Sequence, residues 1–205
     1  SERLGYKIFH KVLNAADYGV AQTRQRFICV GVKKNLPDFE FPKQSHSNPK
    51  KPIKGTKKWV TCGDILNDID FDLPEDEKMQ AGSKHKELLK LVPPGDNYLF
   101  FTEERNHPEP IFKWRSRYWS FLLKLSPDRP SWTIQASHSN NMGPFHWNNR
   151  FLRIQEIKRI QTFEDGHTFL GNFKEQWRQV GNAVPPKLAF TIAMSINAQI
   201  IKYNI

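Results

Sequence analysis

Residues 179–186 read Gln-Val-Gly-Asn-Ala-Val-Pro-Pro, and an apolar pattern follows them from Leu188 to Ile200. Glycine allows backbone angles that other residues avoid, asparagine caps or bridges, and proline suits the first turn of a helix. In the pattern that follows, an apolar residue recurs at every fourth position. This spacing predicts a helix that starts at the proline pair and packs one face on a sheet. An ordinary helix N-terminus explains these residue types, but not their full order.

The N-terminal residues predict a pair of antiparallel strands joined by an exposed loop. Tyr6–Asn14 reads as the first strand, and the continuous apolar run at residues 27–32 reads as a buried second strand. Cys29 lies inside this run, so we expect a small core residue and not a nucleophile. Gly19, in the loop, is a candidate for a positive φ angle.

Gln22, Arg24 and Arg26 stand at alternate positions just before the second strand. In extended backbone all three side chains point to the same side. Arginine keeps its charge and carries a rigid fork of donors, so two such groups require anions or carbonyl oxygens as partners. The alternative is an exposed strand end with solvated arginines, and spacing alone leaves both interpretations open.

The composition favours a polyanionic partner. Lys and Arg number 31 against 21 Asp and Glu, a net charge of +10 at pH 7, and neutralising phosphates releases counterions. The alternative is a lysine-rich solvated surface. No apolar run is long enough for a bilayer and no signal peptide precedes the first strand, so a cytoplasmic location without a membrane partner is expected. The cysteines and histidines lack the spacing of a disulfide framework or a metal site.

A third segment, Arg-Phe-Leu-Arg-Ile-Gln-Glu at residues 150–156, opens a predicted helix. In this order and with these gaps, residues 18–26, 150–163 and 179–186 resemble the last three motif blocks of the cytosine-5 DNA methyltransferases. The resemblance implies an α/β fold: the C-terminal part of a class I S-adenosylmethionine-dependent methyltransferase sheet. It also implies a small, irregular, mostly β target-recognition domain between the first and second blocks.

The resemblance further implies roles for individual residues. In the family, the second arginine of the Gln-x-Arg-x-Arg block contacts O2 of the flipped cytosine, and the first supports the active site. Carried over, Arg26 is the base-contacting residue, with Arg24 and Gln22 beside it. The asparagine of the last block lies next to the S-adenosyl-L-methionine pocket, which implies cofactor contacts for Asn182 and Ala183.

The expected domain organisation follows from the positions of the blocks. Residues 1–44 form a methyltransferase-domain segment, residues 45–149 the target-recognition domain, and residues 150–205 the helix that returns to the methyltransferase domain. Within the middle part, short helices are predicted near Gly63–Asn67 and Lys84–Leu91, and residues 41–58 read as a linker rich in proline and lysine.

Double-stranded DNA is the partner that the resemblance implies for the middle part. Thr133-Ile134 resembles the family's Thr-(Leu/Ile/Val) pair, which lines the DNA cleft. Arg115, Arg117, Arg129 and the lysines of residues 50–58 are candidates for phosphate contacts. A solvated charge is the alternative for each of these basic residues.

The front half of the family pattern is missing from the sequence. No Pro-Cys-Gln triplet, Glu-Asn-Val acid or Gly-rich cofactor loop occurs, and neither Cys29 nor Cys62 has the neighbours of the triplet. We therefore expect the chain to be inactive alone and to need an N-terminal catalytic half, as a separate subunit or as part of the same protein. The alternative is a non-enzymatic, sequence-specific DNA-binding module derived from such an enzyme.

Overall fold

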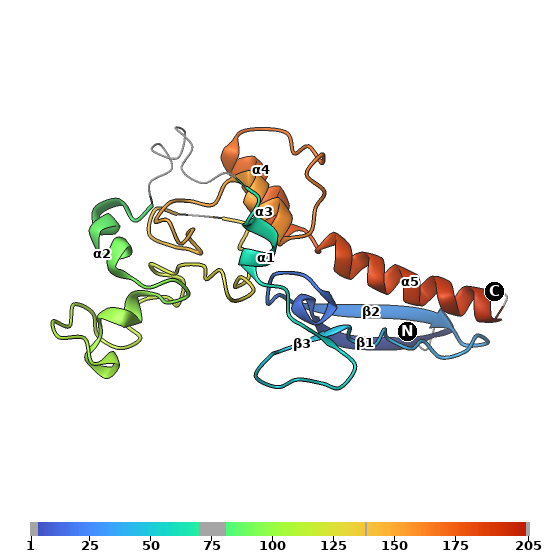
Figure 1. Cartoon of the computed structure of the whole chain (residues 1–205). Helices are drawn as coiled ribbons and strands as arrows, with labels where there is room; N and C mark the ends of the chain where they lie inside the picture. Colours follow the sequence, from blue (N-terminus) through green and yellow to red (C-terminus); the bar gives the residue numbers. More distant parts are fainter. Residues whose placement is uncertain (1–3, 70–80, 138, 204–205) are drawn as a thin grey trace.

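The computed structural model describes residues 4–69, 81–137 and 139–203. Figure 1 shows a long strand pair, β1 and β2, running alongside helix α5, with α1, α3 and α4 grouped at one end of it. A lobe that carries α2 and many loops lies on the far side of this helix group. The predictions for residues 70–80, 138 and 204–205 lie outside the described residues.

The strand pair is as predicted. β1 (Tyr6–Asn14) pairs in antiparallel register with β2 (Gln25–Lys33). The connection begins with the 3-10 helix η2 (Ala15–Tyr18), which ends at Gly19 with φ 79°. Glycine reaches this left-handed angle without the clash that a side chain brings, so the predicted positive φ is confirmed.

The prediction that β2 is buried is wrong. α5 (Pro186–Tyr203) covers one face of the pair, where Leu13, Val20 and Leu188 form a small core. On the other face Val12 and Phe27 are 56% and 63% exposed. Cys29 lies on that open face and is exposed, so it is not a core residue. Apolar composition alone does not tell which face another element covers.

The regular pattern of α5 is buried only in its first turns. Leu188 and Ile192 are 0% and 9% exposed, whereas Ile196 and Ile200 are 36% and 42% exposed. The helix therefore packs on the sheet near its N-terminus, and its distal part is open to solvent.

A second core unites elements from the middle and the end of the chain. α1 (Cys62–Leu66), α3 (Ile154–Ile160) and α4 (Phe173–Asn182) contribute Leu66, Ile157, Ile160, Trp177 and Val180 to one buried cluster. The sequence reading missed α4, although it has a capping box formed by Asn172 and Glu175. This cluster joins residues on both sides of the expected boundary at residue 149. The division of the chain into domains stays a prediction.

A buried ion pair anchors the start of α3. The Glu156 carboxylate, 0% exposed, accepts hydrogen bonds from Arg150 Nη1 at 2.9 Å and Nη2 at 2.8 Å. It also accepts one from the backbone N–H of Arg153 at 2.8 Å. One carboxylate thus satisfies both a guanidinium fork and a free donor at the helix N-terminus.

The remaining lobe is irregular, but it is not mostly β as expected. It contains η4 (Ser83–His85), α2 (Lys86–Leu91), η5 (Tyr98–Phe101) and η6 (Glu103–Arg105). The described part of residues 81–149 has isolated bridges in place of strands. Its core is aromatic and aliphatic, with Leu89, Tyr98, Phe101, Leu122 and Phe145 almost fully buried. Its backbone bonds are made mainly in turns, because few stretches run parallel long enough to build a ladder.

The predicted linker is an ordered loop. β3 (His46–Ser47) and β4 (Lys57–Lys58) pair in parallel, and residues 48–56 connect them.

Within the described residues, no helix combines the length and the apolar character that crossing a bilayer requires.

Candidate active site

Two segments that are far apart in the sequence run side by side just before the start of β2. Gln22 forms a parallel bridge with Ser131, and the Thr23 N–H donates to the Ser131 carbonyl at 2.8 Å. The N–H of Ile134 donates to Gln22 Oε1 at 2.9 Å, and Thr133 Oγ1 donates to the Thr23 carbonyl at 2.9 Å. The structure therefore places the Thr133-Ile134 pair directly against the Gln-x-Arg-x-Arg segment.

Arg24 joins these two segments to the turn at residues 181–183. Its guanidinium is buried, with 2% of the residue exposed. It donates to the carbonyl of Ile134 at 2.9 Å, of Gly181 at 2.6 Å and of Ala183 at 3.1 Å. A rigid fork of donors suits three carbonyl oxygens that converge from different directions. The sequence predicted either anions or carbonyl oxygens as partners of this arginine. The partners of Arg24 are carbonyl oxygens.

The turn between α4 and α5 is held from two further sides. Gln161 Nε2 donates to the carbonyl of Val180 at 3.0 Å, and the N–H of Lys187 donates to Thr162 Oγ1 at 3.1 Å. Asn182 is exposed and Ala183 is half-buried. The backbone of this turn is fixed, while the Asn182 amide is left at the surface.

Gly181 is required by the packing of this turn. A Cβ at this position would lie 2.4 Å from the Gln135 carbonyl oxygen and 2.8 Å from Ala136 Cα. Trp177 Nε1 holds the same carbonyl with a hydrogen bond of 2.9 Å. Because backbone atoms cannot yield as a flexible side chain does, only glycine fits without a shift.

Arg26 differs from Arg24 in its surroundings. It is half-buried, and among the described residues its guanidinium bonds only the neighbouring Gln25 carbonyl, at 2.7 Å. Partial burial lowers the pKa of Arg26. The cation therefore lies at the edge of the Arg24 network with donors left for another group.

The predicted DNA contacts are spread over the structure. Thr133 is exposed, whereas the Ile134 side chain is fully buried in the core with α3 and α4. Arg115 and Arg117 are exposed in the α2 lobe, and the Arg117 guanidinium lies 6.0 Å from the centre of the Phe121 ring. Neither arginine belongs to the Arg24 network.

Neither cysteine is placed as a nucleophile. Cys62 is fully buried in α1, and burial raises the pKa of its thiol to about 12. Cys29 is exposed on β2, away from the loop that carries Arg24. No group of His, Cys, Asp or Glu in the described residues is arranged to hold a metal ion.

Gln161, which donates to the Val180 carbonyl, stands in the segment at residues 150–163 that resembles the family. Sequence reasoning missed two other residues that help to position the segments, Ser131 and Thr162. The Ser131 carbonyl accepts hydrogen bonds from the Thr23 N–H and hydroxyl, and Thr162 Oγ1 accepts one from the Lys187 N–H. They follow no periodicity, so no signal in the sequence separates them from other polar residues.

The family model of the C-5 cytosine-specific DNA methylases matches residues 1–198. The chain belongs to this family. The Type II methyltransferase M.SacI of Streptomyces achromogenes is 40% identical over 213 residues, which cover 96% of this chain and 53% of that protein. M.NgoFVII of Neisseria gonorrhoeae is 31% identical over 197 residues, covering 95% of this chain and 51% of that protein. This methylase chain spans about half the length of the curated relatives it matches.

Solved methyltransferase structures share the fold of this C-5 methylase chain. The S. pombe Dnmt2 methyltransferase matches with a TM-score of 0.59 at 11% identity, over 100% of this chain and 60% of that one. Entamoeba histolytica EhMeth matches with a TM-score of 0.54 at 15% identity, over 98% and 55%. The mixed helix and strand content of this chain is therefore that of a methyltransferase fold.

Proposed function

We propose that this chain supplies the C-terminal half of a DNA (cytosine-5)-methyltransferase. The complete enzyme would transfer a methyl group from S-adenosyl-L-methionine to C5 of a flipped cytosine in a specific duplex site. The chain would contribute a cation for the base, one wall of the cofactor pocket and the target-recognition domain. The observation that carries the proposal is the Arg24 network, because it joins the Gln-x-Arg-x-Arg segment to the Thr133-Ile134 pair and to the turn at residues 181–183.

The role proposed for Arg26 follows from the chemistry of cytosine. When a cysteine thiolate from the catalytic half adds to C6, negative charge spreads towards O2 and N3 of the base. A fixed cation beside O2 stabilises that charge in the transition state. Arg26 fits this role, since its guanidinium has donors to spare and Arg24 fixes the backbone two residues before it.

The turn at residues 181–183 fits one wall of a cofactor pocket. S-adenosyl-L-methionine would supply the methyl group. Asn182 is exposed and presents an amide, which both donates and accepts hydrogen bonds, to a polar edge of the cofactor. Ala183 is small and half-buried, and its carbonyl is held by Arg24.

Exposed apolar faces favour a catalytic half as partner over a stand-alone DNA-binding module. On β1 and β2, Val12 and Phe27 form a cross-strand pair that is open to solvent. On α5, Phe190, Met194 and Ile201 are 65%, 49% and 71% exposed. A module that acts alone should have covered such surfaces, because large exposed apolar patches mark interaction sites.

A chimeric enzyme tests the proposal. The part of M.SacI that this chain does not match, expected to be its front half, would be fused to this chain in place of the matching part of the relative. Transfer of a tritiated methyl group to duplex DNA would be compared with that of the front half alone. We expect transfer by the chimera, and Arg26→Ala should lower its rate by about 10²–10³-fold.

Two results would contradict the proposal. One is a folded chimera that binds DNA yet transfers no more methyl groups than the front half alone. The other is an Arg26→Ala chimera with an unchanged rate, which would remove the base-contacting role from this residue.

A further inference from the structure

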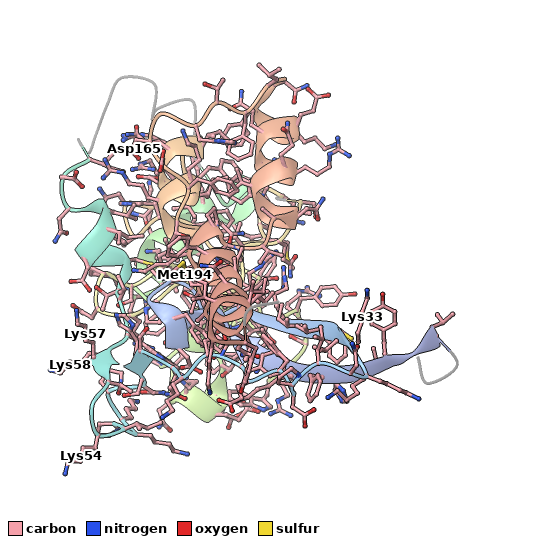
Figure 2. The ribbon with its side chains drawn as sticks, turned by 90° about the vertical axis from the view of Figure 1, so that its right-hand side faces the viewer. Lys33, Lys54, Lys57, Lys58, Asp165 and Met194 are labelled. Carbon is pink, nitrogen blue, oxygen red and sulfur yellow. The ribbon has the colours of Figure 1, made fainter. Side chains whose placement is uncertain are left out.

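The loop between β3 and β4 carries an unusual concentration of positive charge. From residue 41 to residue 63 the sequence has six lysines and no Asp or Glu. Five of these lysines lie in residues 50–58, here called the basic loop, and all five are exposed. In Figure 2 Lys54, Lys57 and Lys58 gather on one side of the molecule, away from Lys33. Nearby His46 has a lowered pKa, caused first by burial and then by Lys187 and Lys57.

The basic loop is held in a fixed shape. The buried Ser47 hydroxyl bonds the N–H of Ile53 at 3.1 Å and the Thr56 hydroxyl at 2.7 Å. Asn48 Oδ1 accepts the N–H of Lys50 at 2.9 Å. A loop that is ordered before binding loses less entropy when it meets a partner.

The loop is also tied to the candidate active site. Trp59 Nε1 donates to Asp17 Oδ1 at 2.8 Å, and the N–H of Ser45 donates to the Asp17 carbonyl at 3.0 Å. Asp17 lies in η2, a few residues before Arg24. The lysines therefore keep a constant position relative to the Gln-x-Arg-x-Arg segment.

A cavity of about 920 Å³ lies between the basic loop and residues 124–132. Its walls include the cations Lys50, Lys124 and Arg129, one acidic residue, and the indoles of Trp59 and Trp132. Cations next to flat apolar walls suit a sugar–phosphate unit, since phosphate pairs with cations and the faces of sugars and bases pack on aromatic rings.

The cavity adjoins the Gln-x-Arg-x-Arg segment. Thr23 lines it, whereas Gln22 and Arg24 on either side of Thr23 are buried. Alternation along an extended segment thus directs Thr23 to the cavity and its neighbours to the interior. Arg26 is three residues further along the chain, roughly 10 Å of extended backbone, a distance that a bound duplex spans.

Lys124 supports an anionic ligand in the cavity. The residue is 2% exposed, and burial lowers the pKa of its amine to about 8. Among the described residues its amine makes one long hydrogen bond, 3.4 Å to the Lys90 carbonyl. A nearby phosphate would stabilise the charged form of this amine.

We propose that the basic loop and this cavity form a second contact surface for the sugar–phosphate backbone of duplex DNA, next to the site of the target base. The inference rests on the proposed DNA methyltransferase function. It adds a surface that contacts the DNA backbone independently of base sequence. Contacts of this kind position the duplex and contribute equally to all sequences.

Salt-dependent binding tests the surface. Binding of the full chain to a labelled duplex would be measured by fluorescence anisotropy at several salt concentrations. The triple variant Lys54→Gln, Lys57→Gln, Lys58→Gln tests the basic loop. The matched control, Lys33→Gln, Lys34→Gln, Lys202→Gln, removes the same charge from the strand end and α5. Circular dichroism checks that both variants are folded.

We expect the loop variant to bind at least about tenfold more weakly, with the slope of log K against log salt reduced by about 0.9 for each lost phosphate contact. The control should keep the wild-type slope. Arg129→Gln tests the cavity separately and should reduce the slope by about 0.9. Equal slopes for the loop variant and the control, or an unchanged slope for Arg129→Gln, would overturn the assignment.

The same assay separates this inference from the proposed function. If the wild-type chain binds duplex but the two triple variants behave alike, the surface is wrong and the function stands. If the loop variant loses affinity as expected but the chimeric enzyme transfers no methyl group, the surface stands and the catalytic proposal fails. A wild-type chain that binds no duplex would overturn the surface, and the chimeric enzyme would then decide the proposed function.

Discussion

Replacing Arg24 by methionine removes the guanidinium donor from three carbonyl oxygens, two in buried hydrogen bonds and one in a partly buried hydrogen bond. They belong to Ile134, Gly181 and Ala183. Each unsatisfied buried acceptor costs about 1–3 kcal/mol. Local relaxation, and relief from burying a charge, offset part of this sum. We therefore expect the free energy of unfolding to fall by about 3–5 kcal/mol, a large share of the total for an ordinary domain.

Urea unfolding followed by far-UV circular dichroism measures this loss. With a slope of about 2 kcal/mol per molar urea, the midpoint should fall by about 1.5–2.5 M. Arg24→Lys should lie between wild type and methionine, because an ammonium can reach some of the carbonyls but lacks the planar fork. Arg26→Met is the matched control. Its guanidinium bonds only the adjacent Gln25 carbonyl among the described residues, so stability should change by no more than about 0.5 kcal/mol.

The reasoning is refuted if Arg24→Met and Arg26→Met have the same midpoint. That result would mean that water or a rearranged backbone replaces the Arg24 donors at little cost. In the chimeric enzyme, Arg26→Met should reduce the rate of methyl transfer, although its free energy of unfolding stays near that of wild type.

Three further variants test other parts of the fold. Gly181→Ala should lower stability by about 1–3 kcal/mol, seen as a lower thermal midpoint, whereas Gly166→Ala, with open space around it, should not; equal midpoints would contradict the close packing. Glu156→Gln should cost about 3–5 kcal/mol, because the Arg150 charge stays buried without its carboxylate; a chemical denaturation curve like that of wild type would disprove this. The Lys124 amine titrates near pH 8 when folded and near 10.4 when unfolded, so the unfolded chain binds more protons between these values. Stability should therefore rise with pH in this window, and Lys124→Met, more stable at pH 7, should lose its advantage by pH 10.5; a constant difference from pH 7 to 10.5 would be evidence against the shift.

The elements near the chain ends could be predicted because their signals are local. β1 and the start of α5 follow from apolar patterns and prolines, and the positive φ of Gly19 follows from residue type. The capping box that starts α4 at Asn172 is also a local signal, so this helix was within reach of the sequence. The exposure of Phe27 was not, because it depends on which neighbouring element covers the strand.

The sequence predicted which residues belong to the candidate site, but not the hydrogen bonds that join them to distant segments. Alternate spacing indicated that Gln22 and Arg24 share a side, and both are indeed buried together. Their partners are backbone carbonyls and an N–H group of distant segments, and every residue carries such groups. The residue types at positions 134, 181 and 183 therefore do not predict their hydrogen bonds with Arg24.

The distances along the chain between Arg24 and its acceptors bear on how the protein is made. The acceptors follow Arg24 by 110, 157 and 159 residues. At 5–20 residues per second, roughly 8–30 s of synthesis separate Arg24 from Gly181. Until the turn at residues 181–183 is made, Ile134 supplies the one acceptor of the three that is present. The Arg24 network is thus completed late in synthesis, when its last segment joins the chain.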